Sequence, residues 1–407
     1  MQHASLKGLE VNIKIRLVAN FLRKLSNEMI IPYMTIYLAQ SFGASISASV
    51  IFVILLSGIG SSLQGGLLAD KFSCKKILVS CEGLHMFSLL GLVLGIYYQN
   101  FTLIFISYFL KNIFVTLATA SSEAIIIDAS QSWQRPLIYS LSKWSNSLSI
   151  PLGATAGAFL YYSHFNETLC FTIFISLLVF LSYCFLEDKN KVMDSQRQEN
   201  SIKAYKVVFA DKKYTLFLLS SLLLFGIEFQ FFNYIPVYFS KISNAINVPF
   251  WNSISGVELY GLLRSENTLM IIFLTPVLIG LIKKIGNDTT SIISLHVFYV
   301  LSFSLFTIYI NPYVSFLCVA MLSIGEVMLM PTRQALMSEM IPEANRGKYL
   351  SAFHLAARGG NIVSVVFFFL SSYLNPIFIT LGILIMGIAS TYLYLATTER
   401  RVVVSTF

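Results

Sequence analysis

The chain has 407 residues, of which 56% are hydrophobic and only 12% are charged, and its mean hydropathy is +0.72. This balance excludes a soluble enzyme and predicts an all-α polytopic membrane protein. The formal net charge of +8 is therefore interpreted as a sign of orientation in a bilayer, not of nucleic-acid binding. The five cysteines show neither paired spacing nor a metal motif, so we expect no disulfide and no metal site.

Twelve apolar runs follow one another along the chain, each close to or above the 20 residues that a helix needs to cross a bilayer. The longest polar segment begins at Glu187 and separates six runs from six. We therefore predict an N-terminal six-helix bundle at 1–187, a cytosolic linker at 188–213 and a C-terminal bundle at 214–407. The runs are 14–40, 46–69, 77–98, 101–128, 136–162, 169–187, 214–240, 265–286, 290–310, 312–337, 348–373 and 375–397.

Basic residues fall almost entirely on the side that holds both termini. Only Lys241 and Arg264, which bound a predicted external loop, fall on the other side. The positive-inside rule then places both termini in the cytoplasm. No cleavable signal pattern precedes the first span, so we expect a multi-pass protein of a cell membrane, most simply the bacterial cytoplasmic membrane.

A short basic loop, Gly65–Lys76, joins the second and third runs. Gly66 would let backbones approach closely, and Asp70 supplies a carboxylate beside Lys71 and Lys75. The loop resembles the signature Gly-x-x-x-Asp-(Arg/Lys)-x-Gly-(Arg/Lys)-(Arg/Lys) of the major facilitator superfamily, although Ser73 and Cys74 depart from it. The resemblance implies a gating role for Gly66, Asp70, Lys71 and Lys75, with Asp128 as a structural partner of the loop.

Ionisable groups inside a span are costly, and they mark a pathway or a pair. In the first run, Lys24 and Glu28 are four residues apart and either pair on one face or face a cavity. In the fourth run, Lys111 precedes a polar stripe that indicates water or a partner helix alongside. This stripe consists of Asn112, Thr116, Thr119 and Glu123.

The fifth run carries small residues at helical spacing, which is typical of close helix packing. They are Ser142, Asn146, Ser149, Gly153 and Gly157, and Lys143 and Trp144 lie among them.

In the second half, Glu228, Asn233 and Glu326 lie within spans, and His354, Arg358 and Asn361 form a polar face. Glu326 is either a proton-linked group or the partner of Arg358 on the next helix. His85 and His296 stand alone in the sequence and are interpreted as packed or interfacial.

These features resemble LmrP-type multidrug/proton antiporters of the same superfamily. The matching segments are Ile125–Ser130, Arg135, Trp144, Asn146, Leu148–Ser149, Asn233, Pro236–Val237, Phe250–Trp251, Gly325–Val327 and Pro331. The resemblance implies working carboxylates at Asp70, Asp128 and Glu326. Two other acids of that group fall on Ser142 and Phe232 here, and Glu228 is expected to replace the second.

We therefore expect a proton-coupled antiporter that exports lipophilic, cationic compounds by alternating access. Proton coupling is expected at Glu326, Glu228 and Glu123, because desolvation favours protonation of a carboxylate. Abundant aromatic rings suit a flat cation. The expected substrate cavity comprises Glu28, Lys111, Asn112, Ser142, Lys143, Trp144, Asn146, Phe232, Asn233, His354, Arg358 and Asn361.

The alternative is a proton-coupled transporter of a polar or anionic metabolite held by Arg358, Lys111 and Lys143. A receptor or scaffold is disfavoured because the linker is too short for a signalling domain. No nucleotide-binding motif is present, so the proton gradient is the expected energy source, without a cofactor. The expected partners are a small-molecule substrate, protons and the bilayer, with no nucleic acid, and the expected state is a monomer.

Overall fold

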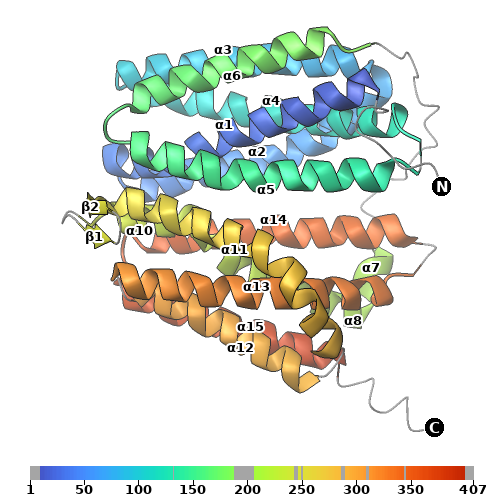
Figure 1. Ribbon diagram of the computed structural model, residues 1–407, viewed down its shortest axis with the longest axis vertical. Coiled ribbons are helices and arrows are strands. Elements are labelled where there is room, and N and C mark those ends of the chain that lie inside the picture. The colour runs from blue at the N-terminus through green and yellow to red at the C-terminus, as the bar shows by residue number, and fades with distance from the viewer. Residues whose placement is uncertain are drawn as a thin grey trace. The chain divides into compact units, whose positions relative to one another are not determined.

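The computed structural model of the chain is almost entirely helical (Figure 1). It describes residues 10–131, 133–187, 206–242, 246–248, 251–285, 289–308, 311–342 and 345–398. The elements are α1 (Val11–Phe42), α2 (Ala44–Lys71), α3 (Cys74–Tyr97), α4 (Phe101–Asp128), α5 (Arg135–Leu160), α6 (Phe165–Cys184), α7 (Lys206–Ala210), α8 (Lys212–Glu228), α9 (Gln230–Asn233), α10 (Ile235–Ser240), β1 (Ile246–Val248), β2 (Trp251–Ile254), α11 (Gly256–Ile285), α12 (Thr289–Ile308), α13 (Pro312–Met340), α14 (Arg346–Leu370) and α15 (Pro376–Thr398).

The chain forms two compact units. Of the described residues, the first unit contains those in 10–34 and 50–187, and the second contains 35–49 and those from 206 to 398. The predicted linker at 188–213 lies mostly outside the described residues. Its described part is the helix α7 and the start of α8, where Asp211 caps the helix by accepting from the Tyr214 amide at 3.1 Å.

Eight helices of the described part are long and apolar enough to cross a membrane, with α8, α9 and α10 taken together as one span. The helices α1, α5 and α11 are also long, at 32, 26 and 30 residues, but each carries more charged or polar side chains. A polytopic helical membrane protein is therefore confirmed. The count of twelve spans stays a prediction.

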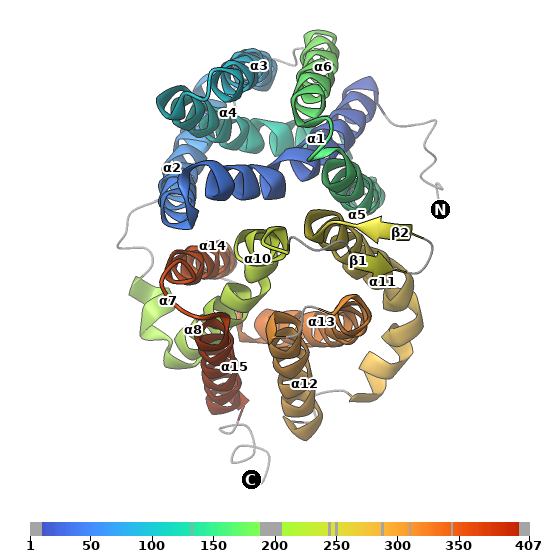
Figure 2. The ribbon, with the colours of Figure 1, turned by 90° about the vertical axis from the view of Figure 1, so that its left-hand side faces the viewer.

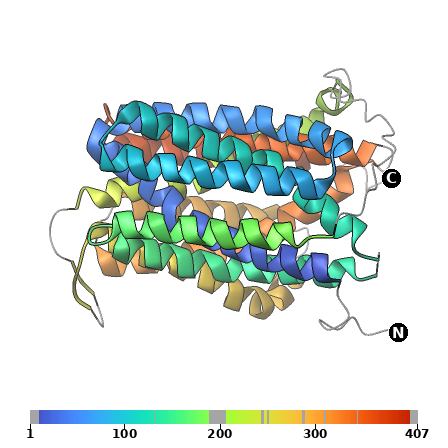
Figure 3. The ribbon, with the colours of Figure 1, turned by 90° about the horizontal axis from the view of Figure 1, so that it is seen from above.

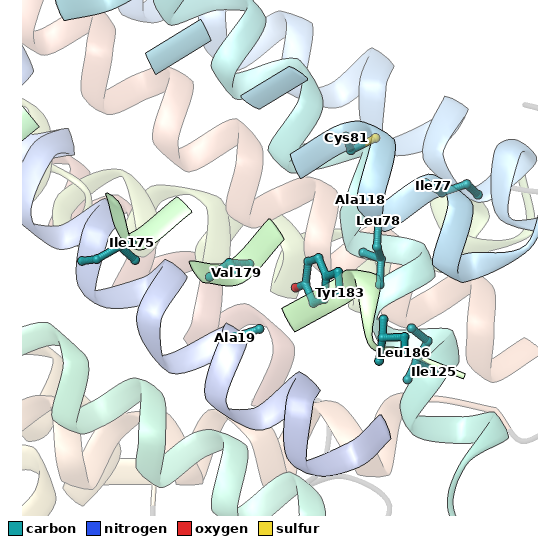
Figure 4. Packing of buried hydrophobic residues seen from close by; sticks show 10 residues of the cluster. All are labelled: Ala19, Ile77, Leu78, Cys81, Ala118, Ile125, Ile175, Val179, Tyr183 and Leu186. Carbon is teal, nitrogen blue, oxygen red and sulfur yellow. The ribbon is translucent and has the colours of Figure 1, made fainter. Parts of the chain in front are cut away.

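In the first unit, α3 packs against both α4 and α6. Figure 4 shows the buried cluster that joins these helices to α1, with Ala19, Leu78, Ala118 and Val179 from α1, α3, α4 and α6 among its members. Removing such apolar side chains from contact with water or mobile lipid and packing them densely holds the helices together.

The small-residue stripe of α5 packs against α1, as predicted. The Ser149 hydroxyl donates to the Phe21 carbonyl at 3.2 Å. A Cβ atom on Gly153 would lie 2.7 Å from the Leu25 carbonyl oxygen, and one on Gly157 would lie 2.7 Å from that of Met29. Only glycine therefore permits this approach of the two backbones.

The close approach predicted for Gly66 is found at its neighbour instead. A Cβ atom on Gly65 would lie 2.6 Å from the Leu117 carbonyl oxygen on α4, whereas one on Gly66 would meet nothing within 4 Å. Adjacent residues point about 100° apart around a helix, so only one of two consecutive glycines can face a given neighbour.

In the second unit, α8 packs against α14 and α15, α11 packs against α13, and α12 packs against α13 and α15. Figure 2 shows α12 of this unit lying beside both α13 and α15. The run predicted as one helix at 214–240 is divided into α8, α9 and α10, with breaks at Phe229 and Tyr234.

The predicted external loop from Lys241 to Arg264 is shorter than expected. A β-hairpin pairs Val248 with Trp251, and it projects beyond the adjoining ends of α10 and α11 (Figure 3). Helix α11 then begins at Gly256. A capping box sets this boundary, because Glu258 accepts from the Ser255 amide at 2.6 Å while the Glu258 amide donates to the Ser255 hydroxyl at 3.3 Å. Placing Arg264 in a loop was therefore wrong.

Candidate functional site

Two half-buried carboxylates and one buried guanidinium gather in the second unit. Glu228 is the last residue of α8, Glu326 lies within α13 and Arg264 lies within α11. The charges of all three act on one another. We call Glu228, Arg264, Asn267 and Glu326 the acidic cluster.

Asn267, one turn after Arg264 on α11, positions the Glu326 carboxylate. Its side-chain amide donates to Oε2 of Glu326 at 3.3 Å and to the Ser323 hydroxyl at 3.0 Å. The amide is 5% exposed, so water does not compete freely for these bonds. The neutral amide of Asn267 thus orients the Glu326 carboxylate without adding a positive charge that would neutralise it.

Glu228 is less constrained. Its Oε2 atom is buried and has no hydrogen-bond partner among the described residues, and the same holds for the hydroxyl of Tyr299. Both Glu228 and Glu326 act electrostatically on Tyr299. Buried oxygens without donors are expensive unless something binds to them, so this cluster has the chemistry of a site for a proton or a cation.

Arg264 is held at the cluster by aromatic rings. Its guanidinium carbon lies 4.1 Å from the centre of the Phe232 ring and 5.7 Å from that of Phe231, and the residue is 7% exposed. Such cation–π contacts stabilise a buried positive charge without neutralising it. Phe232 was predicted to line a cavity, and its observed contacts include this one with Arg264 and one with the ring of Phe229, whose centre lies 6.0 Å away.

The pairing of Glu326 with Arg358, one of the two alternatives left open for this acid, is not found among the described contacts. The hydrogen-bond donor to Glu326 is Asn267, and the guanidinium that acts on it is that of Arg264. The error in the start of α11 removed Arg264 from consideration.

The polar face predicted on α14 is bonded to α9 at Asn361. The Asn233 side chain donates to Asn361 at 2.9 Å and to Ser364 at 3.0 Å. His354 is exposed and Arg358 is half-buried. Asn233 and Asn361 therefore join the broken segment α9 to α14.

In the first unit, two predicted acids are in ion pairs. Lys24 Nζ lies 2.7 Å from Glu28, as the i to i+4 spacing suggested. Arg16 lies 3.0 Å from Glu123 and also donates to the Ser122 carbonyl. Glu123 is thus tied to α1, although its side chain is 49% exposed.

Lys111 is 4% exposed. Its ammonium group donates to Asn27 at 3.3 Å and lies 5.7 Å from the centre of the Tyr108 ring. Asn112, next to it, donates to the Ile54 carbonyl on α2 at 2.9 Å. The polar stripe of α4 therefore faces partner helices at both Asn112 and Glu123.

On α5, Ser142 and Asn146 both accept from Asn20 of α1, at 3.4 and 2.7 Å. Lys143 and Trp144 are exposed on the first unit. The four residues were predicted to line one cavity. The structure divides them between a helix–helix contact and an exposed face.

The predicted gate lies largely outside the described side chains. Asp70, Lys71 and Asp128 lie in helices, but their side chains are among those that the structure does not describe. Lys75 is half-buried in the first turn of α3.

The sequence did not identify a buried charge network in the first unit. Glu82 of α3 pairs with Arg23 of α1 and accepts from Ser176 of α6 at 2.8 Å. His85 Nδ1 lies 3.2 Å from the same carboxylate, so His85 does not stand alone. Nor does His296, whose Nε2 lies 2.9 Å from Arg333. The position of Glu82 within the apolar run 77–98 was the signal that could have identified this network, because an acid inside a span needs a partner.

Comparison with known proteins places these features in a family. A model described as the Major Facilitator Superfamily matches residues 17–365. A "Na(+), Li(+), K(+)/H(+) antiporter" of Planococcus maritimus is 25% identical over 381 residues, which cover 89% of each chain. An uncharacterized MFS-type transporter of Bacillus subtilis, YqjV, is 23% identical over 355 residues, covering 85% of this chain and 83% of that one.

Solved structures agree on the fold. The peptide transporter POT in complex with sulfate gives a TM-score of 0.74 at 15% identity, covering 97% of this chain and 95% of that one. The nucleoside transporter NupG gives 0.72, also at 15% identity, covering 96% of this chain and 99% of that one.

Proposed function

This chain belongs to the major facilitator superfamily and is a transporter, and from that premise we propose that it is a proton-coupled antiporter that exports monovalent cations. The observation that carries the proposal is the acidic cluster. It presents two half-buried carboxylates, Glu228 and Glu326, neither of which makes a direct ion pair among the described residues, and the Oε2 atom of Glu228 is itself buried.

Antiport requires that a proton and a substrate compete for one charge state. A carboxylate in a low-dielectric site binds either a proton or a cation, because one neutralises the charge that would attract the other. Release of the cation on one side then follows protonation, and loss of the proton on the other side restores the site. The similarity to a cation/proton antiporter supports this assignment.

Two kinds of cation suit the site. The carboxylate, amide and hydroxyl oxygens around Glu326 suit a hard alkali cation. The rings of Phe231 and Phe232, which already stack on a guanidinium, suit a flat lipophilic cation, as in export of cationic drugs.

The test uses the purified protein in liposomes with an acidic interior and a trapped pH-sensitive dye. Adding Na⁺, K⁺ or tetraphenylphosphonium outside should raise the internal pH, and the cation that does so identifies the class. Glu326→Gln and Glu228→Gln should abolish the response. Glu167→Gln is the matched control, because that side chain is 70% exposed and remote in sequence from the cluster. A wild-type protein that releases no protons with any of these cations would refute cation/proton antiport.

A second candidate, transport of an anionic metabolite, is favoured by Lys111 alone. This lysine is buried, and the structure shows it bonded to a neutral amide. In the same liposomes, proton movement driven only by organic anions, and lost in Lys111→Ala, would establish this candidate instead.

A further inference from the structure

We propose that Arg264 is a built-in counter-ion that limits the acidic cluster to one positive charge at a time, so that the site takes a proton or a monovalent cation and rejects divalent cations. This inference rests on the proposed function and adds a specificity-determining residue to it.

The argument begins with the charges that meet at the cluster. Among the described residues, the side chains whose charges act on Glu228 are Glu326 and Arg264, and the charge that acts on Glu326 alongside its Asn267 bond is again that of Arg264. Two carboxylates and one guanidinium leave one net negative charge. One proton or one monovalent cation neutralises that charge.

A divalent cation would leave an uncompensated positive charge in the same place. Arg264 and Asn267 are buried, at 7% and 5% exposure, and the two glutamates beside them are half-buried. An unpaired charge in such a setting costs several kcal/mol. Discrimination by an unfavourable charge against the wrong ligand is an effective route to specificity.

Aromatic side chains hold the guanidinium group of Arg264 in one position. Phe232 stacks on the guanidinium at 4.1 Å, Phe231 flanks it at 5.7 Å, and Phe231 itself packs on Tyr260 and Phe306 with ring centres 6.1 and 5.5 Å apart. These rings hold the positive charge beside the carboxylates, while an arginine side chain does not lose its proton. Its charge therefore stays constant while those of the two acids change.

The experiment compares Na⁺ and Mn²⁺ as drivers of proton release from the acid-loaded liposomes, with tetraphenylphosphonium replacing Na⁺ if that is the active cation. Wild type should respond to the monovalent cation only. Arg264→Gln leaves two carboxylates without a counter-charge, and it should gain Mn²⁺-driven proton release at an initial rate at least tenfold above the wild-type background. Arg264→Lys keeps the charge and should keep the monovalent preference.

A second pair of variants removes the dependence on Arg264→Gln folding well. Glu228→Gln alone leaves a net neutral site and should lose the response. The double variant Glu228→Gln with Arg264→Gln again has one net negative charge, and it should regain the monovalent response. Recovery is a result that a merely structural role for Arg264 would not give.

The outcomes separate the two proposals. Suppose that wild type exchanges monovalent cations for protons. The counter-ion role is then wrong, and antiport stands, if Arg264→Gln rejects Mn²⁺ as wild type does. The same conclusion follows if the double variant stays inactive although it elutes as a single species in size-exclusion chromatography. If wild type exchanges no monovalent cation, the proposed function itself fails.

Discussion

At the scale of single residues, Glu82 shows how a membrane protein keeps a charge in its interior. The carboxylate pairs with Arg23, contacts His85 and accepts from Ser176, and it is 2% exposed. The ring of Tyr183 lies 5.6 Å from the guanidinium carbon of Arg23. Charge, hydrogen bonds and an aromatic ring together compensate for the loss of solvation.

Glu82→Gln should therefore destabilise the protein by about 3 kcal/mol, because it leaves the Arg23 charge buried without its carboxylate. The measurement is the free energy of unfolding, or the thermal midpoint in detergent. Glu167→Gln is the control, since its contact with His164 joins side chains that are 70% and 58% exposed and should matter little. Equal stability of the two variants would show that the buried pair contributes nothing.

Asn267 is expected to act on substrate affinity. Asn267→Ala removes the donor that orients Glu326, and a hydrogen bond to a charged group contributes about 1.5–3 kcal/mol. The cation concentration for half-maximal proton release should rise at least tenfold, with a smaller effect in Ser323→Ala, which leaves the Asn267 bond to Glu326 in place. Larger loss in the serine variant would contradict this role.

Residue types and spacing alone predicted some of these contacts. Helical periodicity made Lys24 and Glu28 a candidate pair, because both lie on one face of one helix, but it left a role in a cavity open. It could not select Asn267 and Arg264 as neighbours of Glu326, or Arg16 as the partner of Glu123, because cross-helix neighbours depend on tertiary packing. Single polar residues in apolar runs, such as Glu82, show that a partner is needed but not which one.

At the scale of elements, glycine position decides how closely helices approach. Gly153 of α5 faces the Leu25 carbonyl, whereas a Cβ atom on Gly60 of α2 would meet nothing within 4 Å. The stripe on α5 was predictable from its spacing. The choice of Gly65 over Gly66 was not, because it depends on the rotation of α2 about its own axis.

Substituting alanine at these two glycines should change stability in opposite directions. Gly60→Ala gains helix propensity and should stabilise by about 0.5–1 kcal/mol. Gly153→Ala brings a methyl group within 2.7 Å of a backbone oxygen, and overpacking of this kind costs about 1–3 kcal/mol. Thermal midpoints of the two purified variants, measured against wild type, test the contrast. If the Gly153→Ala variant were more stable than wild type, α1 and α5 would have to move apart at little cost in free energy.

At the scale of the whole molecule, the two units hold their charges differently. In the first unit Arg16, Arg23 and Lys24 each lie in an ion pair with an acid. In the second, Glu228 and Glu326 share Arg264 at a distance. Fixed pairs stabilise a scaffold, whereas incompletely compensated acids can exchange protons and ligands. We therefore expect substitutions of paired acids to change stability, and substitutions in the acidic cluster to change transport.

The orientation of the chain is the last property that the sequence predicts and that experiment can decide. From the distribution of basic residues we expect the loop between α4 and α5 inside the cell and the β-hairpin outside. Gln131 and Ser253 are exposed on these two segments. In a variant whose five cysteines are replaced by serine, Ser253→Cys should react with a membrane-impermeant maleimide in intact cells. Gln131→Cys should react only after the cells are permeabilised. The reverse labelling pattern would show that the orientation is opposite to the predicted one. Labelling of both sites in intact cells that exclude the reagent would place both on the same side of the membrane, and would contradict the odd number of spans predicted between them. The distinction matters for the proposed antiport, because it decides which side would supply the proton that we propose displaces the cation from Glu326.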